Sequence, residues 1–417
     1  MLNIVMHTPK SFCILPWISL ESTAAGWIKP CCMYNINMTD NNNQPFNLNN
    51  NTLDDAWQSE YYRNLRQDFL DGKMPEGCTR CWSEEASGKV SKRIRDNARF
   101  KHHITNDMLE NPKIKYLDLK LGNICNLKCR ICGTHSSSKW IAEQQHYDKQ
   151  DNHEEKHTRH SWPETNKEFW QQLEELLPTL EYIDFTGGEP FMIKDQFKLL
   201  KFCVEKGYAK NIGVHYNSNG TQLPNEALEE IWPHFKTVDV QFSIDGIGEQ
   251  FEYQRHPAKW DKALEVLQAF KNKQSKKFTV GVCHTINIFN VMYIPEFLAW
   301  AEQFGISVYL NSLHYPDYYN IRCLPYDAKR LISRKLQDHP NPNVKTFIDY
   351  MNQEGKDHYD EWMKFVNWTV RKDEFRKEKF DNTFPELAEA TEYNKYILSL
   401  IHISEPTRPE RIAYAGV

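Results

Sequence analysis

The chain has 417 residues, of which 40% are hydrophobic and 26% are charged, as in an ordinary globular protein with room for two or more domains. Its 51 Lys and Arg against 56 Asp and Glu leave a formal charge of −5, which does not indicate a nucleic-acid partner. No run approaches the ~18 apolar residues of a membrane helix, and the N-terminal MLNIVMHTPKSF lacks the apolar core of a signal peptide. We therefore expect a cytoplasmic protein without a membrane partner, whose clustered cysteines bind metal rather than form disulfides.

Four cysteines near the N-terminus have the spacing of a metal site. Cys13 is followed by Cys31 in GWIKPCC, and Cys78 and Cys81 form a C-x2-C pair in EGCTRCW. Four thiolates could close a zinc site or ligate an iron–sulfur cluster completely. Zinc is less favoured because the first two cysteines are split by seventeen residues, and a metal-free thiol group is less favoured still. Cys32 adjoins Cys31 and stays open as an alternative ligand.

Three segments beside these cysteines carry predictions of their own. Asn35 to Asn51, with nine Asn in seventeen residues, is expected to be a solvated loop with no core. Residues 52–70 are expected to form one helix, with Thr52 and Asp55 as a capping signal. The basic stretch from Lys89 to Lys101 is interpreted as a solvated helix joining two domains, in preference to a docking surface.

Three further cysteines lie close together in LGNICNLKCRICG, residues 121–133. Cys125, Cys129 and Cys132 have the spacing C-x3-C-x2-C and follow a run, 114–121, that predicts a buried strand. Three such thiolates can hold three corners of a cubic iron–sulfur cluster and leave the fourth iron open to a small molecule. This loop resembles the signature of radical S-adenosylmethionine (SAM) enzymes, although the residue before the third cysteine, Ile131, is often aromatic in that family.

The resemblance implies a chemistry as well as a cofactor. A [4Fe-4S] cluster on Cys125, Cys129 and Cys132, which are then the catalytic residues, would bind SAM and cleave it reductively to methionine and a 5′-deoxyadenosyl radical. That radical would abstract a hydrogen atom from a substrate. A one-electron reductant such as a flavodoxin or ferredoxin would be a partner.

The N-terminal cysteines resemble the auxiliary-cluster domain known as twitch, the short relative of the SPASM domain. In that family the cysteine of G-x4-C and both cysteines of C-x2-C are ligands, so Gly26 favours Cys31 over Cys32. The resemblance implies a second iron–sulfur cluster, of the [4Fe-4S] type, on Cys13, Cys31, Cys78 and Cys81. It would take an electron from the substrate radical or relay electrons. In most relatives this module follows the barrel, whereas here it precedes it.

The central part of the chain alternates short apolar strands with helix-length amphipathic segments. Six such units in series favour parallel strands with right-handed crossovers. The strands are expected at 114–121, 182–185, 212–216, 238–244, 279–285 and 306–310. The count matches the incomplete, TIM-like (β/α)6 barrel of the radical SAM family, so the fold class is α/β with a small N-terminal auxiliary-cluster domain. The expected domains are 1–100 (auxiliary), 101–315 (barrel), 316–396 (helical) and 397–417 (tail).

In such barrels the chemistry lies at the C-terminal ends of strands, and polar or glycine-rich turns do follow these strands. In the resembling family, the loop after the second strand binds the SAM amino group, and the later turns offer further SAM contacts. The SAM-binding candidates are Gly187, Gly188, Glu189 and Pro190, then Asn219 in NSNG, Ser243 and Asp245 in SIDG, and Asn287. Ser243 is a candidate for the SAM carboxylate or ribose, Asp245 for substrate or structure, and Asn287 for the ribose or adenine.

Two peripheral stretches are given no function. The run from His146 to His160 is interpreted as a solvated insertion, in preference to a metal site. Residues 398–408, LSLIHISEPTR, resemble the translation of a sequencing-library adapter. We therefore expect the native chain to end near Tyr396 and the tail to be poorly packed.

The predicted function is that of a radical SAM enzyme with an auxiliary cluster, performing a net oxidation of a small molecule. One alternative is a radical SAM enzyme that modifies a peptide or protein, which a precursor-peptide reading frame beside the gene would favour. The other is a non-catalytic zinc-binding module, which predicts a colourless protein without iron.

Overall fold

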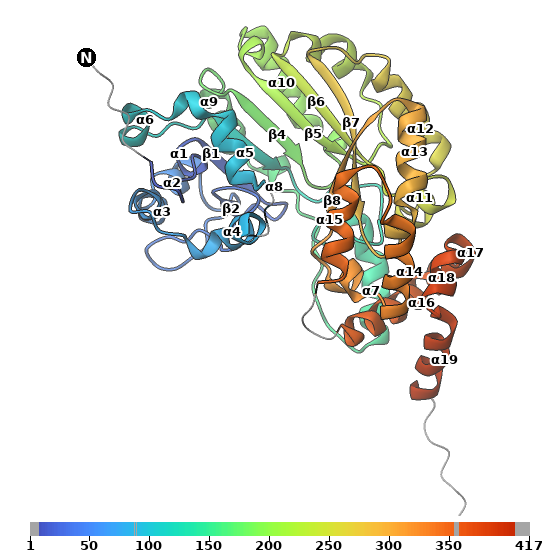
Figure 1. The fold of residues 1–417 in the computed structure, drawn as a ribbon. Coiled ribbons are helices and arrows are strands. Elements are labelled where there is room, and N and C mark those ends of the chain that lie inside the picture. The colour runs from blue at the N-terminus through green and yellow to red at the C-terminus, as the bar shows by residue number, and fades with distance from the viewer. Residues whose placement is uncertain (1–7, 87, 89, 354–357, 405–417) are drawn as a thin grey trace, which may run out of the picture. The chain divides into compact units, whose positions relative to one another are not determined.

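The computed structural model describes residues 8–86, 88, 90–353 and 358–404 (Figure 1). The chain divides into two compact units: unit 1 comprises Met1–Ser243 and Asp261–Val282, and unit 2 comprises Ile244–Trp260 and Cys283–Val417. The division falls within strand β7 (Phe278–Ile286), which therefore contributes to both units. Within the described residues, no helix has the length and apolar character needed to cross a membrane.

Unit 1 is built on a mostly parallel sheet in the order β2-β1-β3-β4-β5-β6-β7, and in unit 2 β8 lies next to β7. Neighbouring strands from β1 through β3 to β6 pair in parallel, while β2 is antiparallel to β1. The strands are β1 (Ser19–Ser22), β2 (Ile28–Lys29), β3 (Tyr116–Lys120), β4 (Tyr182–Thr186), β5 (Gly213–Ser218), β6 (Thr237–Ser243) and β8 (Ser307–Ser312). All six predicted strands are confirmed within two residues at each end. The sequence did not predict β1 and β2, which extend the sheet from the N-terminal segment.

The sheet of unit 1 has one apolar and one polar face, because side chains alternate along each strand. The crossover helices pack on the apolar face, where the Tyr216 ring lies 5.4 Å from Trp232 and Phe242 lies 5.0 Å from Phe270. The other face carries Asp118 and Lys120 on β3, Asp184 and Thr186 on β4, His215 and Asn217 on β5, and Asp239 and Gln241 on β6. When a parallel sheet is covered on both faces, the sequences of its strands are usually continuous apolar runs. The polar face therefore differs from a face that is packed as ordinary core.

The helices of unit 1 include a blue N-terminal set gathered beside β1 and β2 (Figure 1). They are α1 (Leu15–Ile18), α2 (Leu53–Trp57), α3 (Glu60–Leu70), α4 (Thr79–Ala86), α5 (Lys92–Arg99), α6 (Asn106–Glu110), α7 (Ile141–Gln150), α8 (Trp162–Thr165), α9 (Lys167–Leu176), α10 (Lys194–Glu205) and α12 (Trp260–Lys271). The capping box of Thr52 with Asp55 is confirmed. The single helix expected over 52–70 is wrong: Ser59 caps a second helix, because its side chain accepts a hydrogen bond from the Tyr62 amide.

The asparagine-rich segment is not the solvated loop that its composition predicted. Met38, Phe46 and Leu48 are buried, and Asn47 forms a bridge with Trp27. The Asn47 side chain donates to the Ala25 carbonyl at 3.1 Å. Asparagine side chains here satisfy the backbone of tight turns, and the few apolar residues between them are enough to anchor the segment.

Unit 2 is largely helical beyond β8. Its helices are α11 (Glu249–Gln254), α13 (Ile294–Phe304), α14 (Tyr326–Leu336), α15 (Pro342–Met351), α16 (Tyr359–Arg376), α17 (Phe380–Thr383), α18 (Pro385–Ala390) and α19 (Tyr393–Ser404). Its core contains a cluster of aromatic rings around Phe289, including Phe365 and Phe384. Helix α19 continues past Tyr396, and Leu398 is 59% exposed. The remainder of the adapter-like stretch, from residue 405, lies outside the described residues.

Candidate functional site

The three-cysteine loop is held in shape by Asn123, which is fully buried. Its amide nitrogen donates to the carbonyls of Thr134 at 2.7 Å and Thr158 at 3.1 Å, and its side-chain oxygen accepts from the His160 amide at 2.9 Å. His157 also contacts Asp148 at 2.6 Å. The interpretation of the histidine-rich run as a solvated insertion is therefore wrong for its C-terminal part, which braces the cysteine loop.

The sulfurs of the loop differ in burial. Cys129 is buried, whereas Cys125 and Cys132 are half-buried. The Trp140 indole donates to the Cys129 carbonyl at 3.0 Å, and the Leu127 amide donates to the Cys125 sulfur at 3.4 Å. Burial, followed by the neighbouring Cys129, raises the pKa of Cys125 to about 11. A thiolate at this position therefore needs a bound cation, which is what an iron–sulfur cluster provides.

The Gly187–Gly188 turn packs directly on the cysteine loop. Gly188 has φ +55°, and a Cβ there would overlap the carbonyl oxygen of Ile124, the residue before Cys125. A Cβ at Gly187, with φ +78°, would lie 2.7 Å from the Lys120 Cβ. The Glu189 amide donates to the same Ile124 carbonyl at 2.8 Å. Both glycines are thus required by close approach as well as by backbone conformation.

Glu189 joins the second and third strand ends. Its carboxylate is fully buried and accepts from the Ser218 hydroxyl at 3.0 Å and the Asn219 amide at 2.7 Å. Asn219 in turn directs its side-chain amide at the Cys125 sulfur, 3.6 Å away. Pro190 follows as the first residue of a buried 3-10 turn, Pro190–Met192. The structure therefore brings the cysteine loop, the GGEP loop and the NSNG turn together.

The remaining predicted SAM contacts are divided between the two units. Ser243 ends β6 in unit 1. In unit 2, buried Asp245 pairs with Arg255 at 2.6 Å and accepts from the Thr285 amide at 2.9 Å. Asn287, also in unit 2, is fully buried and donates to the Thr285 carbonyl at 3.0 Å. The side chains of Asp245 and Asn287 therefore both make contacts that stabilise unit 2.

The four N-terminal cysteines form one group in unit 1. Cys13, Cys31 and Cys81 are buried, and Cys78 is half-buried. Burial raises the pKa of Cys13, and the charges of Cys78 and Cys81 add to the increase. The pKa of Cys31 is raised by burial and then by Cys32 and Cys13. Four neighbouring thiols, three of them buried, fit a fully ligated metal cluster.

Arg93 fixes the geometry between these cysteines. It is buried, pairs with Glu85 at the end of α4 and donates to the carbonyls of Phe12 at 2.8 Å and Lys10 at 3.0 Å. It therefore ties the helix that carries Cys81 to the segment that carries Cys13. The interpretation of the basic stretch as a solvated helix is wrong at Arg93, because this side chain is a structural clamp.

Cys32 has different neighbours from Cys31. Burial raises the pKa of Cys32 to about 12, and the charges that act on it are those of Lys92, Asp118, Glu21 and Lys120. Most of these residues belong to the polar face of the sheet rather than to the cysteine group. This separation supports Cys31 as the ligand of the pair.

A row of ionisable residues crosses the polar face in register. Glu21, Asp118, Asp184, His215 and Asp239 are aligned partners on β1, β3, β4, β5 and β6. Neighbouring parallel strands lie about 4.8 Å apart, so each of these side chains adjoins the next. The row is a continuous line of charge across five strands.

Hydrogen bonds order this row but leave two acceptors unused. His215 Nδ1 lies 2.7 Å from Asp239 Oδ2, and the Tyr116 hydroxyl donates to Asp184 Oδ2 at 2.5 Å. Asp184 Oδ1 and Glu21 Oε2 are buried, and each has no hydrogen-bond partner among the described residues. Burial raises the pKa of Asp184, against the lowering effect of His215. Unpaired buried acceptors are costly, so this row is suited to a ligand that donates hydrogen bonds.

Sequence reasoning missed the row, Asn123 and Arg93. A signal for the row was present: the strands read YLDLK, YIDFT, GVHYNS and TVDVQFS, with a polar residue at every second position where a buried parallel strand would be apolar. No comparable local pattern marks Asn123 or Arg93, because their partners are distant in sequence.

Comparison with known families agrees with this geometry. Residues 119–301 match the Radical SAM superfamily, and residues 13–82 match SPASM, an iron-sulfur cluster-binding domain. The chain carries a radical SAM domain preceded by a SPASM domain. The cofactors of such a protein are a SAM-binding [4Fe-4S] cluster, SAM itself and an additional iron–sulfur cluster in the SPASM domain. The predicted family, fold class and cofactors are confirmed, including the N-terminal place of the auxiliary domain.

Similar proteins are distant. The chain is 23% identical over 248 residues to the uncharacterized protein MJ0907 of Methanocaldococcus jannaschii, covering 58% of this chain and 72% of that one. It is 32% identical over 123 residues to Fe-coproporphyrin III synthase of Methanosarcina barkeri, covering 28% of each.

Solved structures that resemble this radical SAM protein include native anSMEcpe with bound AdoMet, at 17% identity and a TM-score of 0.40 over 61% of this chain and 66% of that one. Streptococcus suis SuiB is similar at 14% identity and a TM-score of 0.35 over 73% and 67%.

Proposed function

We propose that this protein reductively cleaves SAM at a [4Fe-4S] cluster held by Cys125, Cys129 and Cys132, and thereby oxidises a small molecule. The observation that carries the proposal is the hydrogen-bonded assembly of the GGEP loop and the NSNG turn on the three-cysteine loop. When bound, the cluster and SAM supply a 5′-deoxyadenosyl radical, which removes a hydrogen atom from the substrate.

The protein's part in SAM binding is to fix the position of the ligand beside the open corner of the cluster. Three thiols leave that corner without a protein ligand. Because neither Gly187 nor Gly188 has a side chain, this turn can pack against the residue before Cys125 and so lie beside the cluster. Glu189 holds this turn and Asn219 in place, and Pro190 starts the buried turn that follows. Ser243, which ends β6 in the same unit, remains a proposed contact for the carboxylate or ribose of SAM.

The SPASM domain's cluster is proposed to lie on Cys13, Cys31, Cys78 and Cys81, with no open position. A fully ligated cluster transfers electrons and does not bind substrate. We propose that this cluster accepts the electron that the substrate radical loses. The substrate then undergoes a net two-electron oxidation. A flavodoxin- or ferredoxin-like protein is the proposed source of the electron that starts each turnover.

The polar face of the sheet is the proposed substrate contact. Asp184 and Glu21 offer buried acceptors without partners, and His215 lies between two carboxylates. A substrate that carries hydroxyl, amine or amide N–H groups would satisfy these acceptors. Asp118, Asp184, His215 and Asp239 stand on this face where the inner face of a closed barrel is otherwise filled by branched apolar residues, which favours a polar substrate.

The test is SAM cleavage by the anaerobically reconstituted, dithionite-reduced protein. We expect wild type to form 5′-deoxyadenosine and Cys129→Ala to form none above background, while its N-terminal cluster persists. Cys203→Ala is the matched control, since this thiol is buried in α10 away from both cysteine groups and should leave cleavage unchanged. Cleavage at the wild-type rate by Cys129→Ala would refute the proposal.

A further inference from the structure

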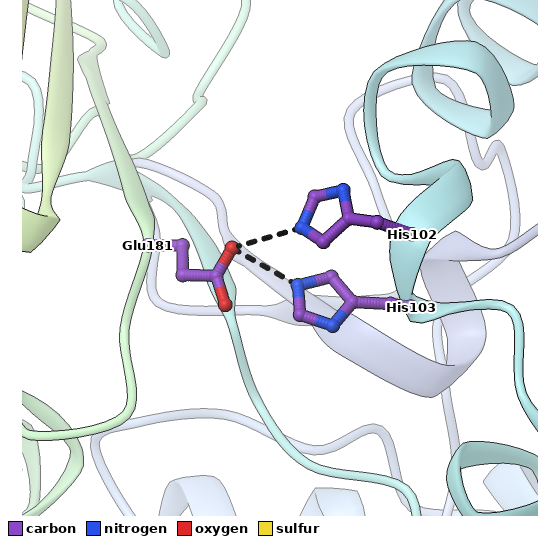
Figure 2. Close-up of side chains that lie close together, drawn as sticks. All are labelled: His102, His103 and Glu181. Carbon is purple, nitrogen blue, oxygen red and sulfur yellow. Dashed lines mark hydrogen bonds and ion pairs between the residues drawn. The ribbon is translucent and has the colours of Figure 1, made fainter.

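Outside the cysteine regions, two histidines and a glutamate converge in unit 1. His102 and His103 lie on the 3-10 turn Lys101–His103, which follows α5, and Glu181 directly precedes β4. These residues are 79 and 78 positions apart in the sequence, yet Figure 2 shows both imidazole rings directed at the carboxylate of Glu181. Convergence of three potential ligands from two distant segments is the first requirement of a metal site.

The distances suit a tetrahedral metal ion. His102 Nε2 lies 3.4 Å from Glu181 Oε2, and His103 Nε2 lies 2.9 Å from the same oxygen. All three ligand atoms lie within 4.8 Å of one another. Zinc bonds of about 2.0–2.1 Å at tetrahedral angles place neighbouring ligand atoms roughly 3.3 Å apart. Small side-chain rotations therefore bring all three atoms onto one zinc ion.

The chemical state of the three groups also fits a metal. His103 Nε2 is buried and has no hydrogen-bond partner among the described residues, although the carboxylate oxygen is close. Its ring nitrogen is thus not aligned on that oxygen, as expected when ligands point at a shared centre.

We propose that His102, His103 and Glu181 form a zinc site, with water as the fourth ligand. A cavity of about 130 Å³ lined by His102 and Glu181, among other residues, gives room for that water. Imidazole and carboxylate ligands suit Zn²⁺ without any thiolate, so this site is chemically separate from the cysteine groups.

The place of the site in the fold indicates a structural role. Glu181 lies where β4 begins, whereas the GGEP loop follows the other end of the same strand. The turn with the two histidines follows α5, the helix whose Arg93 clamps the SPASM cysteines. A metal here would fasten the segment between the SPASM domain and the radical SAM domain to the start of β4, and would take no part in the radical chemistry.

Lys115 opposes the metal and offers a second test. Its ammonium lies 3.7 Å from Glu181 Oε1, the oxygen that the histidines do not approach. A positive charge at this distance disfavours a second cation by Coulomb repulsion. Lys115→Met should therefore strengthen zinc binding several-fold, the opposite of what loss of a ligand does.

The experiment uses the full-length protein with both clusters reconstituted anaerobically, so that the cysteines are occupied, and then freed of loose metal with a chelator. Titration with zinc chloride in a calorimeter should show one site per chain in wild type. His103→Gln and Glu181→Gln should weaken this binding about tenfold or more. His153→Gln is the matched control, because this exposed histidine pairs only with Glu155 among the described residues.

Zinc should also raise the melting temperature of wild type and of the His153→Gln control, and not that of His103→Gln. Equal melting temperatures of all variants without zinc would show that they are folded. Wild type that binds no zinc, or His103→Gln and Glu181→Gln variants that bind it like wild type, would overturn the proposal.

Discussion

The cysteine loop at residues 121–133 and the N-terminal cysteine group place their sulfurs in different surroundings. In the loop, two of the three thiols are half-buried, and the Cys125 sulfur accepts hydrogen bonds from Leu127 and Asn219. In the N-terminal group, three of the four thiols are buried, and the charges that act on Cys13 include those of Cys78 and Cys81. The Cys125 sulfur of the loop thus lies beside polar donors, whereas the sulfurs of the N-terminal group are mostly buried.

This difference teaches how one chain can host two clusters with separate tasks. A cluster that must bind a small molecule needs a missing ligand and a turn that packs closely beside it, which Gly187 and Gly188 allow. A cluster that only passes electrons needs complete ligation and a rigid frame, which Arg93 supports from α5. Substitutions in the cysteine loop region and in the N-terminal cysteine group can test this difference.

The largest effect is expected from the adjacent pair Cys31 and Cys32. Cys31→Ser should remove the N-terminal cluster, so that iron falls from about eight to about four atoms per chain. Cys32→Ser should leave the iron content unchanged, because the charges acting on Cys32 come mainly from the polar face of the sheet. Iron and acid-labile sulfide analysis after anaerobic reconstitution measures both. Loss of iron in Cys32→Ser but not in Cys31→Ser would make Cys32 the ligand. It would contradict the assignment of Cys31 to the cysteine group and of Cys32 to the polar face.

An intermediate effect is expected where the GGEP loop meets the cysteine loop. Gly188→Ala combines a positive φ with a clash against the Ile124 carbonyl, and should cost about 3 kcal/mol of unfolding free energy. Gly207→Ala has a similar positive φ but open space around its Cβ, and should cost only about 1 kcal/mol. Denaturant titration of both variants measures the difference, and SAM binding should weaken only in Gly188→Ala. Equal losses of unfolding free energy in the two variants would show that the GGEP loop does not pack on the cysteine loop.

The smallest effect concerns the row of ionisable residues on the polar face of the sheet. Burial lowers the pKa of His215, but Asp239 and Asp184 outweigh burial and raise it above its usual value of about 6.5. Protonated His215 thus stabilises the fold below about pH 6.5, and this contribution is lost as the pH rises through the raised pKa. Asp239→Asn removes the partner and should cost about 1.5 kcal/mol at pH 6.

The same difference between wild type and Asp239→Asn should shrink toward pH 9, where His215 is neutral in both proteins. Unfolding curves at several pH values measure it, with His153→Gln as a control that shows no such trend. A difference that stays constant from pH 6 to pH 9 would mean that His215 is not held in its charged form by Asp239.

Much of the fold was predictable because the signals are local. The six strands are short apolar runs bounded by turns, and the GGEP and NSNG sequences mark strand ends by residue type alone. Features that depend on distant partners were not predictable. Strands β1 and β2 exist because β1 pairs with β3, almost a hundred residues later.

The cysteines and glycines of the site could be recognised in the sequence, whereas the residues that hold them in place could not. Asn123 and Arg93 act through contacts with carbonyl groups 11 to 83 residues away, which no local pattern reveals. The charged row was visible in principle, since its polar residues alternate with apolar ones on every strand. It was missed because each strand was interpreted as an apolar run, without asking which face its polar residues share.

The most direct test of the contrast is electron paramagnetic resonance of the reduced protein with and without SAM. Cys31→Ser isolates the loop's cluster, and Cys129→Ala isolates the N-terminal cluster. We expect the spectrum of Cys31→Ser to change when SAM is added, since its cluster has an open iron, and the spectrum of Cys129→Ala to stay the same. A spectrum that changes with SAM in Cys129→Ala but not in Cys31→Ser would contradict the account.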